Sequence, residues 1–205
     1  MPFADDIIAG VDDMMASGLI LKHDHTCNVS MALIGGQRVI IKRYNNKGLI
    51  HSLRQNCKPS RARRCWIWGW RLLDAGLPTP QPFGYMEVKR FGLRQCSYLF
   101  TEYLVGSDFA EALKAAGDED ERSRLSRAVD EMVGVLERKR ITHNDLKPPN
   151  VMIAGGRPYI IDLDSMRRIT FFTAFFDKGK DRKHLVKKLL RQGVSTDKRF
   201  NIIDN

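Results

Sequence analysis

The first half of the 205-residue chain carries the hydrophobic pattern of short strands. Residues 18–44 and 82–104 contain β-branched and aromatic runs separated by glycine-containing turn signals, which predicts two or three strands followed by a hairpin. Between these two segments, Ser60 can cap a helix that ends at Gly76. The first half is therefore predicted to be a small antiparallel sheet accompanied by a helix.

The second half carries helical periodicity instead. Residues 107–117 and 118–140 are predicted to be helical, and a last helix is expected from about residue 181 to 191. Two short strands are expected on either side of the turn at residues 154–157. The longest helix has one apolar stripe, formed by Leu125, Val129, Met132, Val133 and Leu136.

Together these patterns predict an α+β fold with two lobes. A small antiparallel-sheet lobe is expected over residues 1–104, and a reduced helical lobe over residues 105–205. The linking segment is expected near residues 102–107. A cleft between two such lobes is a natural site for a ligand.

Composition narrows the possible partners and the compartment. The net charge is +10, and the segment from Arg38 to Arg71 has ten basic residues and no acid, which indicates either an anionic partner or a solvated basic face. No secretory signal and no apolar run of about 18 residues is apparent. The four cysteines form no CxxC pair, so a disulfide framework or zinc site is not expected and a reducing cytoplasm fits best.

Residues 141–164 combine acidic, basic and amide side chains between β-branched runs. Phosphoryl transfer from ATP needs an acid that orients the attacking hydroxyl, oxygen ligands for Mg²⁺, and cations that offset the phosphate charge. Asp145 can be the acid and Lys147 the nearby cation. Asn150 and Asp162 can be the metal ligands, because Mg²⁺ favours oxygen and keeps several waters.

The spacing of these residues predicts how they meet. Asp145 and Asn150 share one tight loop after a helix, and the following hairpin should return the chain so that Asp162 lies against Asn150. The pattern matches the protein-kinase catalytic signature, with HNDLKPPN at 143–150 for H-x-D-L-K-x-x-N and IDLD at 161–164 where D-F-G would be.

Some details of this signature have alternatives. Asp162 is preferred to Asp164 as the metal ligand because it directly ends a strand, which leaves Asp164 to assist or to cap the next turn. His143 is expected to hydrogen-bond within the loop rather than to act as a base. The plainer alternative for Asp145 and Asn150 is that they only cap turns.

The first half should then bind the nucleotide. Lys42 ends a strand in the position of the kinase lysine that contacts the α- and β-phosphates. The segment LFTEYL, residues 99–104, resembles a kinase hinge, in which the backbone of Glu102 and Leu104 would meet the adenine edge and Thr101 would lie at the rear of the pocket.

Two departures from the kinase pattern concern this nucleotide half. No G-x-G-x-x-G precedes Lys42, and Asn28 and Ser30 are the small polar residues whose amides could cover the phosphates instead. The helical glutamate that usually pairs with the lysine is also missing, and Asp74 is expected to face outward rather than to replace it. A pseudokinase that binds nucleotide without transferring phosphate therefore stays a possible interpretation.

The assembled motifs resemble the lipopolysaccharide kinase family, the Kdo/WaaP group, over about residues 25–192. The resemblance depends on segments near both lobes, namely VIIKRYN, SRARRCWIWGWRLLDAGLPTPQP, SYLFTEYLVG, HNDLKPPN and IDLD. It implies a protein-kinase-like fold that uses ATP and Mg²⁺ and phosphorylates a sugar hydroxyl, of Kdo or heptose, in the lipopolysaccharide inner core. It also implies an anionic glycolipid partner rather than nucleic acid, and work at the cytoplasmic face of the inner membrane.

Another acceptor, either a protein Ser or Thr or a small molecule, is the second interpretation, although only 41 residues follow Asp164 and a peptide-binding platform would need more. The basic segment containing Arg61, Arg63 and Arg64 could face phosphorylated sugars or anionic headgroups. Trp66, Trp68 and Trp70 alternate too closely for one helical face, so at least one should be partly exposed.

The segment FFTAFF at residues 171–176 has two interpretations. On a helix its four phenylalanines would share one face. That face is expected to pack in the small helical lobe, and the alternative is that it contacts a membrane, since basic residues flank it.

Overall fold

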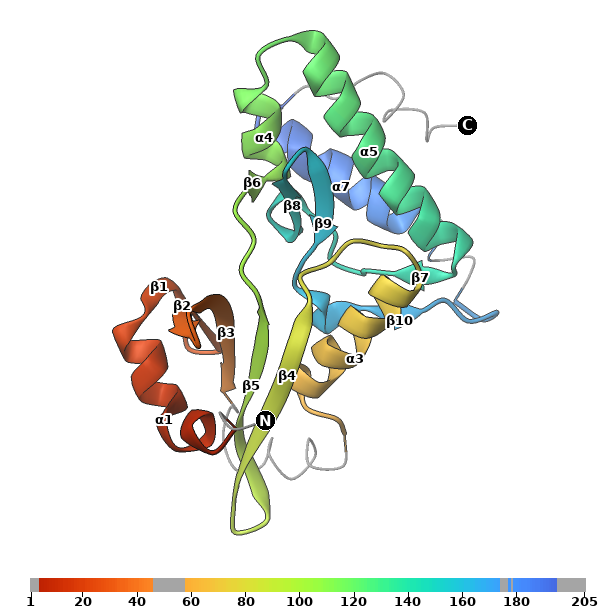
Figure 1. Ribbon diagram of the computed structural model, residues 1–205. Coiled ribbons are helices and arrows are strands. Elements are labelled where there is room, and N and C mark those ends of the chain that lie inside the picture. Colours follow the sequence, from red (N-terminus) through yellow and green to blue (C-terminus); the bar gives the residue numbers. More distant parts are fainter. Residues whose placement is uncertain (1–3, 46–57, 174–176, 178, 195–205) are drawn as a thin grey trace. The chain divides into compact units, whose positions relative to one another are not determined.

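The structure is a computed structural model that describes residues 4–45, 58–173, 177 and 179–194 (Figure 1). The chain divides into two compact units. The first comprises Met1–Trp70 and Pro80–Tyr103, and the second comprises Arg71–Thr79 and Leu104–Asn205.

A five-stranded antiparallel sheet forms the first unit, with the strand order β1-β2-β3-β5-β4. The predicted strands within residues 18–44 and the predicted hairpin within residues 82–104 are confirmed. The β2–β3 and β4–β5 turns each use two consecutive residues with positive φ, Gly35-Gly36 and Phe91-Gly92, which matches the right-handed twist of the flanking strands. The strands are β1 (Leu19–His23), β2 (Cys27–Ile34), β3 (Gln37–Asn45), β4 (Pro82–Arg90) and β5 (Leu93–Glu102).

Helix α1 (Ala4–Ser17), which the sequence analysis did not predict, packs on one face of this sheet. Val11 and Met15 of the helix are buried against alternate residues of the two central strands, Val39, Ile41, Tyr98 and Phe100. The Tyr98 hydroxyl also donates to the Asp12 carboxylate at 2.8 Å. This helix therefore covers the core on its side of the sheet.

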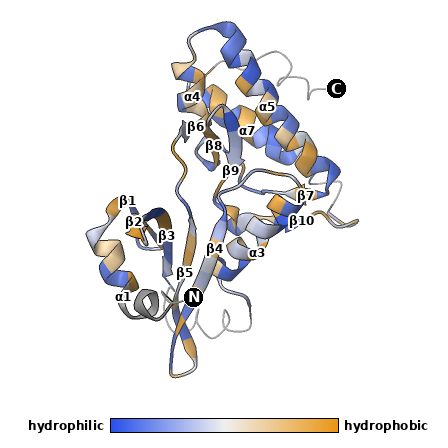
Figure 2. Ribbon diagram, in the orientation of Figure 1, coloured by the Kyte–Doolittle hydropathy of each residue, from blue (hydrophilic) through white to orange (hydrophobic). Residues whose placement is uncertain are grey.

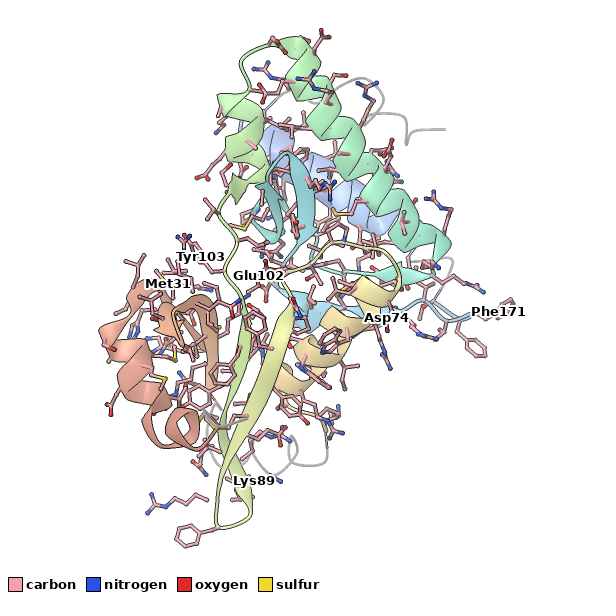
Figure 3. The ribbon with its side chains drawn as sticks, viewed as in Figure 1. Met31, Asp74, Lys89, Glu102, Tyr103 and Phe171 are labelled. Atoms are coloured by element: carbon pink, nitrogen blue, oxygen red, sulfur yellow. The ribbon has the colours of Figure 1, made fainter. Side chains whose placement is uncertain are left out.

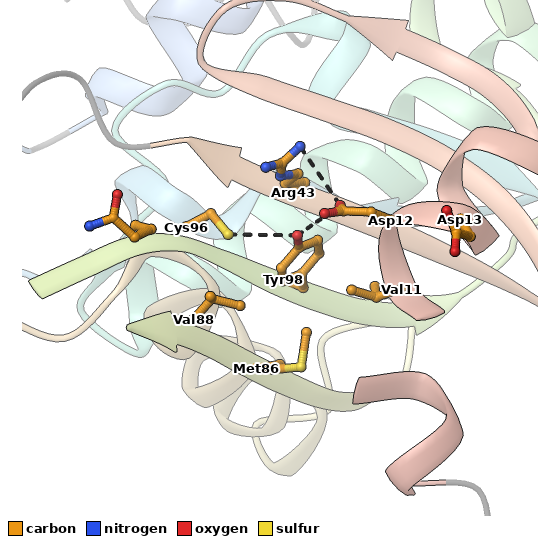
Figure 4. A pocket seen from close by; sticks show the side chains of 9 residues that line it. Val11, Asp12, Asp13, Arg43, Met86, Val88, Cys96 and Tyr98 are labelled. Atoms are coloured by element: carbon orange, nitrogen blue, oxygen red, sulfur yellow. Dashed lines mark hydrogen bonds and ion pairs between the residues drawn. The ribbon is translucent and has the colours of Figure 1, made fainter. Parts of the chain in front are cut away.

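A small pocket of about 350 Å³ lies beside α1 on the same face (Figure 4). Within this pocket, Arg43 forms an ion pair with Asp12 at 3.7 Å, and the Cys96 thiol is 3.6 Å from the Tyr98 hydroxyl. Burial is the largest influence on Tyr98 and raises the pKa of its hydroxyl. Because these contacts join α1 to the sheet, the pocket belongs to the packing of the helix.

Helix α3 (Arg61–Asp74) begins in the first unit and ends in the second. Its first turns contact the sheet through Cys65, whose sulfur is 3.6 Å from the Tyr44 hydroxyl, and through the Trp66 ring, which is 5.4 Å from the Tyr85 ring. Tyr44 and Arg43 are neighbours in β3 and point to opposite faces. Helices α1 and α3 thus contact opposite faces of the sheet.

The predicted cap of α3 is confirmed, because the Ser60 hydroxyl accepts a hydrogen bond from the Arg63 N–H at 3.0 Å. The tryptophans also divide as expected. Trp68 is buried, Trp66 is partly buried and Trp70 is 39% exposed.

Besides the end of α3, the described part of the second unit contains three longer helical segments and two small sheets. The helices are α4 (Phe109–Ala115), α5 (Glu119–Arg138) and α7 (Lys180–Arg191). One sheet orders β6 (Ser107–Asp108), β8 (Val151–Ala154) and β9 (Arg157–Ile160), and the other pairs β7 (Ile141–Thr142) with β10 (Arg167–Arg168). Two single turns of 3-10 helix, η1 (Pro148–Asn150) and η2 (Leu163–Ser165), follow β7 and β9.

The predicted helices of this unit are confirmed, except that the first of them begins two residues later than predicted. Residues 107 and 108 pair with β8, so α4 begins at Phe109, and Asp108 caps it by accepting from the Glu111 N–H at 2.9 Å. Asp118 caps α5 in the same way. All five residues of the predicted α5 stripe are buried, and Figure 2 shows hydrophobic residues interspersed with hydrophilic ones along this helix.

Two further expectations concern the chain as a whole. Within the described ranges, no helix combines the length and the apolarity needed to cross a membrane. Cys27, Cys65 and Cys96 are buried free thiols, whereas Cys57 lies outside the described residues.

Candidate active site

The loop from β7 to β8 contains the residues of the catalytic signature. His143 is completely buried, and its Nε2 is 3.0 Å from the carbonyl oxygen of Ile161. Because a carbonyl only accepts, Nε2 carries the proton. Burial, the largest influence, lowers the pKa of this imidazole. A buried neutral imidazole that is hydrogen-bonded to the backbone fits the expectation that His143 holds the loop and is not a base.

Asp145, Lys147 and Asn150 are brought together in this loop. The Lys147 ammonium donates to Asp145 Oδ2 at 2.8 Å, and the Asn150 side-chain amide donates to the Asp145 carbonyl at 2.8 Å. Both side chains in the ion pair are partly exposed, so the carboxylate is held in place and still reachable. Burial alone would raise the pKa of Asp145, but the hydrogen bond and charge of Lys147 outweigh it and lower that pKa.

The predicted hairpin is present and brings Asp162 beside Asn150. Val151 pairs with Ile160, and the Ile161 N–H donates to the Asn150 carbonyl at 3.0 Å. Asp162 follows in a left-handed backbone conformation with φ 60° and ψ 60°. A non-glycine residue adopts this conformation at a cost of about 1–3 kcal/mol, which the surrounding structure must offset, and such residues cluster at functional sites.

Asp181 is a residue of this site that the sequence analysis missed. It lies in the first turn of α7, is buried, and accepts from the backbone N–H of His143 at 2.7 Å and of Asn144 at 2.9 Å. The Thr142 hydroxyl donates to it as well, at 2.9 Å. One carboxylate thus fixes three consecutive residues immediately before Asp145. The available signal was a lone acid within the basic segment of residues 178–183.

Asn150 and Asp162 have the oxygen atoms that could bind a magnesium ion whose remaining ligands come from the nucleotide phosphates. The Asn150 Nδ2 is committed to Asp145, which leaves its Oδ1 free to bind a metal, and Asp162 lies just after β9, the strand that pairs with β8. Across the part of the chain that the structure describes, no group of three or more His, Cys, Asp or Glu residues could hold a metal. A two-residue oxygen set suits Mg²⁺, which takes its other ligands from phosphate and water.

The phosphate-covering role of Asn28 and Ser30 stays a prediction, and the structure places both residues in the sheet. Both residues lie inside β2 and pair with β1 and β3, so their backbones belong to the sheet and not to a loop. Ser30 is buried, and its hydroxyl donates to the Met15 carbonyl of α1 at 2.9 Å. The actual β1–β2 turn is closed by Asp24, which accepts from the N–H groups of Thr26 and Cys27.

Lys42 lies in the middle of the sheet. It pairs with Val29 on one side and with Leu99 on the other. Leu99 pairs in turn with Tyr85, whose ring contacts that of Trp66 in α3. Directly opposed residues in neighbouring strands share a face, so Lys42 lies on the face that α3 contacts. Among the described residues no ion pair of Lys42 is found, and Asp74 is exposed at the end of α3, as the sequence analysis expected.

The hinge candidates lie where β5 ends. The Glu102 N–H donates to the Gln81 carbonyl at 2.9 Å, and its carboxylate accepts from the Gln81 N–H. The Glu102 N–H is therefore committed, and any adenine contact of this residue would use its carbonyl. Leu104 begins the second unit in the extended segment after β5, and Thr101 pairs with Ile40 inside the sheet. Figure 3 shows Glu102 and Tyr103 on this segment.

Comparisons with known proteins agree with this geometry. A solved structure titled "WaaP in complex with acyl carrier protein" matches with a TM-score of 0.66 over 98% of this chain and 79% of that chain, at 19% sequence identity. This structural similarity shows a protein-kinase-like fold. No curated protein sequence matches the chain.

The family follows from a separate comparison. Residues 34–202 match the family model described as "Lipopolysaccharide kinase (Kdo/WaaP) family". Since this match covers most of the chain, the protein belongs to the lipopolysaccharide kinase family. The predicted family and fold class are both confirmed.

Proposed function

We propose that this protein transfers the γ-phosphate of ATP, with Mg²⁺, to a sugar hydroxyl of the lipopolysaccharide inner core, either Kdo or heptose. The observation that carries the proposal is the partly exposed Asp145 carboxylate, which Lys147 holds by an ion pair while Asn150 holds the Asp145 backbone carbonyl. Membership of the lipopolysaccharide kinase family supports the kind of acceptor.

Asp145 is assigned the role of orienting the acceptor hydroxyl. Its lowered pKa makes it a weak base, so it should accept a hydrogen bond from the hydroxyl at first and receive the proton only when the oxygen–phosphorus bond is largely formed. Lys147 supplies positive charge next to the reacting phosphate. When bound, Mg²⁺ would neutralise phosphate charge, and Asn150 and Asp162 would hold it.

Lys42, Glu102 and Leu104 are assigned to the nucleotide. The Lys42 ammonium would contact the phosphates, and the backbone of the other two residues would meet the adenine edge. The acceptor is an anionic glycolipid, and we place the protein in the cytoplasm, in peripheral contact with the cytoplasmic face of the inner membrane. The basic segment around α3 supports an anionic partner, because Arg63 and Arg64 are exposed there.

One observation favours a pseudokinase as the second candidate. The β1–β2 turn has no glycine, and its Asp24 carboxylate is held ionised by a hydrogen bond from Lys22 and others from Thr26 and Cys27, which lower its pKa. The Lys22 ammonium beside this turn is engaged by Asp24 at 2.9 Å, so its charge is offset before it could meet a phosphate.

Labelled ATP and a panel of lipopolysaccharide cores test the proposal. The purified protein should label a core glycolipid, and Asp145→Asn should remove nearly all transfer while leaving nucleotide binding largely intact. Asp74→Asn, which neutralises an exposed carboxylate elsewhere, is the control and should keep full activity. Label on a protein instead would identify another acceptor. Nucleotide binding without transfer to any acceptor would establish the pseudokinase.

A further inference from the structure

Two phenylalanines are displayed on a turn of the second unit. Phe171 and Phe172 follow β10 and are 85% and 87% exposed. Their rings contact each other edge to face, with centroids 6.0 Å apart. Figure 3 shows Phe171 projecting away from the ribbon. Residues 171–173 form a turn and not a helix, while Phe175 and Phe176 lie outside the described residues. The expectation that this segment packs in the helical lobe is wrong for Phe171 and Phe172.

The turn is built to hold these side chains outward. The Thr170 N–H donates to the Thr173 hydroxyl, and the Thr173 N–H donates to the Thr170 carbonyl, both at 3.1 Å, which closes the turn. At its base, both Arg167 amino groups donate to the buried Asp177 carboxylate. This fixed geometry displays the two rings without giving them a core to enter.

Basic side chains surround the turn from two parts of the chain. Strands β7 and β10 are antiparallel, with Ile141 opposite Arg168. The turn before β7 and the turn after β10 therefore lie at the same end of this ribbon, and the Ile169 N–H donates to the Arg140 carbonyl at 2.7 Å. We call the exposed residues here the basic collar. It consists of Arg138, Lys139, Arg140 and Arg168.

Two described acids near this surface, Asp177 and Glu137, have basic partners. Asp177 is held by Arg167, and Glu137, at the end of α5, lies 3.6 Å from the Arg182 guanidinium. The collar therefore presents a net positive charge around an exposed aromatic pair. Aromatic rings that enter the headgroup region, together with lysine and arginine that attract anionic lipid, are the features of proteins that lie on a membrane surface.

We propose that Phe171, Phe172 and the basic collar are the surface with which this protein contacts an anionic lipid bilayer. The inference rests on the proposed function in one respect, which is that a lipid-anchored acceptor has to be reached at a membrane. Beyond the proposed function, the inference names the part of the fold that contacts the membrane.

Vesicle co-sedimentation of the full chain tests this surface. The wild type should bind vesicles of phosphatidylglycerol and phosphatidylethanolamine and should bind phosphatidylcholine vesicles much more weakly. The double variant Phe171→Ser with Phe172→Ser should bind the anionic vesicles at least tenfold more weakly, with an unchanged melting temperature. Lys139→Gln with Arg168→Gln should weaken binding roughly fivefold for each charge removed, and the loss should shrink at high salt.

Phe91 provides the matched control, since it is a single phenylalanine on the β4–β5 turn that is 91% exposed and lies beside Arg90. Phe91→Ser should leave vesicle binding unchanged. The proposal would be overturned if Phe91→Ser lost as much vesicle binding as the double variant. It would also be overturned if the double phenylalanine variant bound vesicles like the wild type, or if its melting temperature fell sharply. Wild-type protein that ignores anionic vesicles and uses the same phenylalanines to bind an acidic protein would overturn it as well.

A second readout separates this inference from the proposed function. Transfer to a water-soluble, deacylated core oligosaccharide should be the same in the wild type and in the phenylalanine variant. If the wild type binds anionic vesicles but phosphorylates no core acceptor, the proposed function fails and the membrane surface stands. If it phosphorylates the soluble acceptor but does not bind vesicles, the membrane surface fails alone.

Discussion

The backbone N–H of His143 donates to the buried carboxylate of Asp181 at 2.7 Å, across 38 residues of sequence. The same carboxylate accepts from Asn144, whose backbone is left-handed with φ 66°. Asp181 therefore fixes the direction of the chain just before Asp145. It is a positioning residue, because it acts through the loop backbone.

Asp181→Asn should separate positioning from binding. The variant replaces one acceptor oxygen by a donor, so a loop N–H loses its partner, which costs about 1–3 kcal/mol of stability. We expect kcat to fall about 100-fold as Asp145 shifts, while the KM for ATP changes little. Steady-state kinetics at a temperature where the variant is folded check this. A variant with lower stability but normal kcat would show that Asp181 only supports the fold.

Asp162→Ala should abolish the magnesium dependence of nucleotide binding. The carboxylate follows Ile161, whose N–H donates to the Asn150 carbonyl, so the substitution would remove one of the two proposed metal ligands. We expect the affinity for ATP in the presence of Mg²⁺ to fall at least tenfold, and the affinity in EDTA to stay nearly the same. Calorimetric titration with and without the metal measures both values. If Asp164→Ala is the more damaging change, Asp164 is the ligand instead.

The burial of His143 predicts a pH dependence of stability. Its pKa is lowered in the folded protein, whereas an unfolded histidine titrates near about 6.5. Below that pH the unfolded chain binds a proton that the folded chain does not, so the free energy of unfolding should fall as pH decreases from about 6.5 towards the folded pKa. Urea unfolding between pH 5 and 8 measures the slope.

His143→Gln keeps a side-chain N–H donor and removes the titration. It should therefore flatten the slope over this range, even if the variant is less stable overall. A slope identical to that of the wild type would mean that another group causes the dependence.

Gly106→Ala should destabilise the protein because of a close backbone approach. An added Cβ at this position would fall onto the main-chain carbonyl of Ile153 in β8. We expect a loss of about 1–3 kcal/mol or more, seen as a lower melting temperature. Gly117→Ala is the control, because its Cβ would meet only the Glu121 carboxylate at 3.8 Å. If the two variants are equally stable, the approach at Gly106 is less strict than the structure indicates.

The sequence by itself determined the elements whose cause is local. The α5 stripe, the Ser60 cap, the Gly35-Gly36 turn and the β8–β9 hairpin all follow from spacings of a few residues. The loop containing Asp145 and Asn150 could be recognised for the same reason. Periodicity and turn chemistry act over one or two turns of chain, so they are visible without a fold.

Only the tertiary structure decided the contacts that join distant segments. Asp181 meets His143 through the packing of α7, and the Ser30 hydroxyl donates to the Met15 carbonyl of α1. The same is true of Phe171 and Phe172, because their spacing suits a buried face and an exposed one equally well. Which face is covered depends on what else packs there. A local pattern carries no information on this, because burial is set by partners far away in sequence.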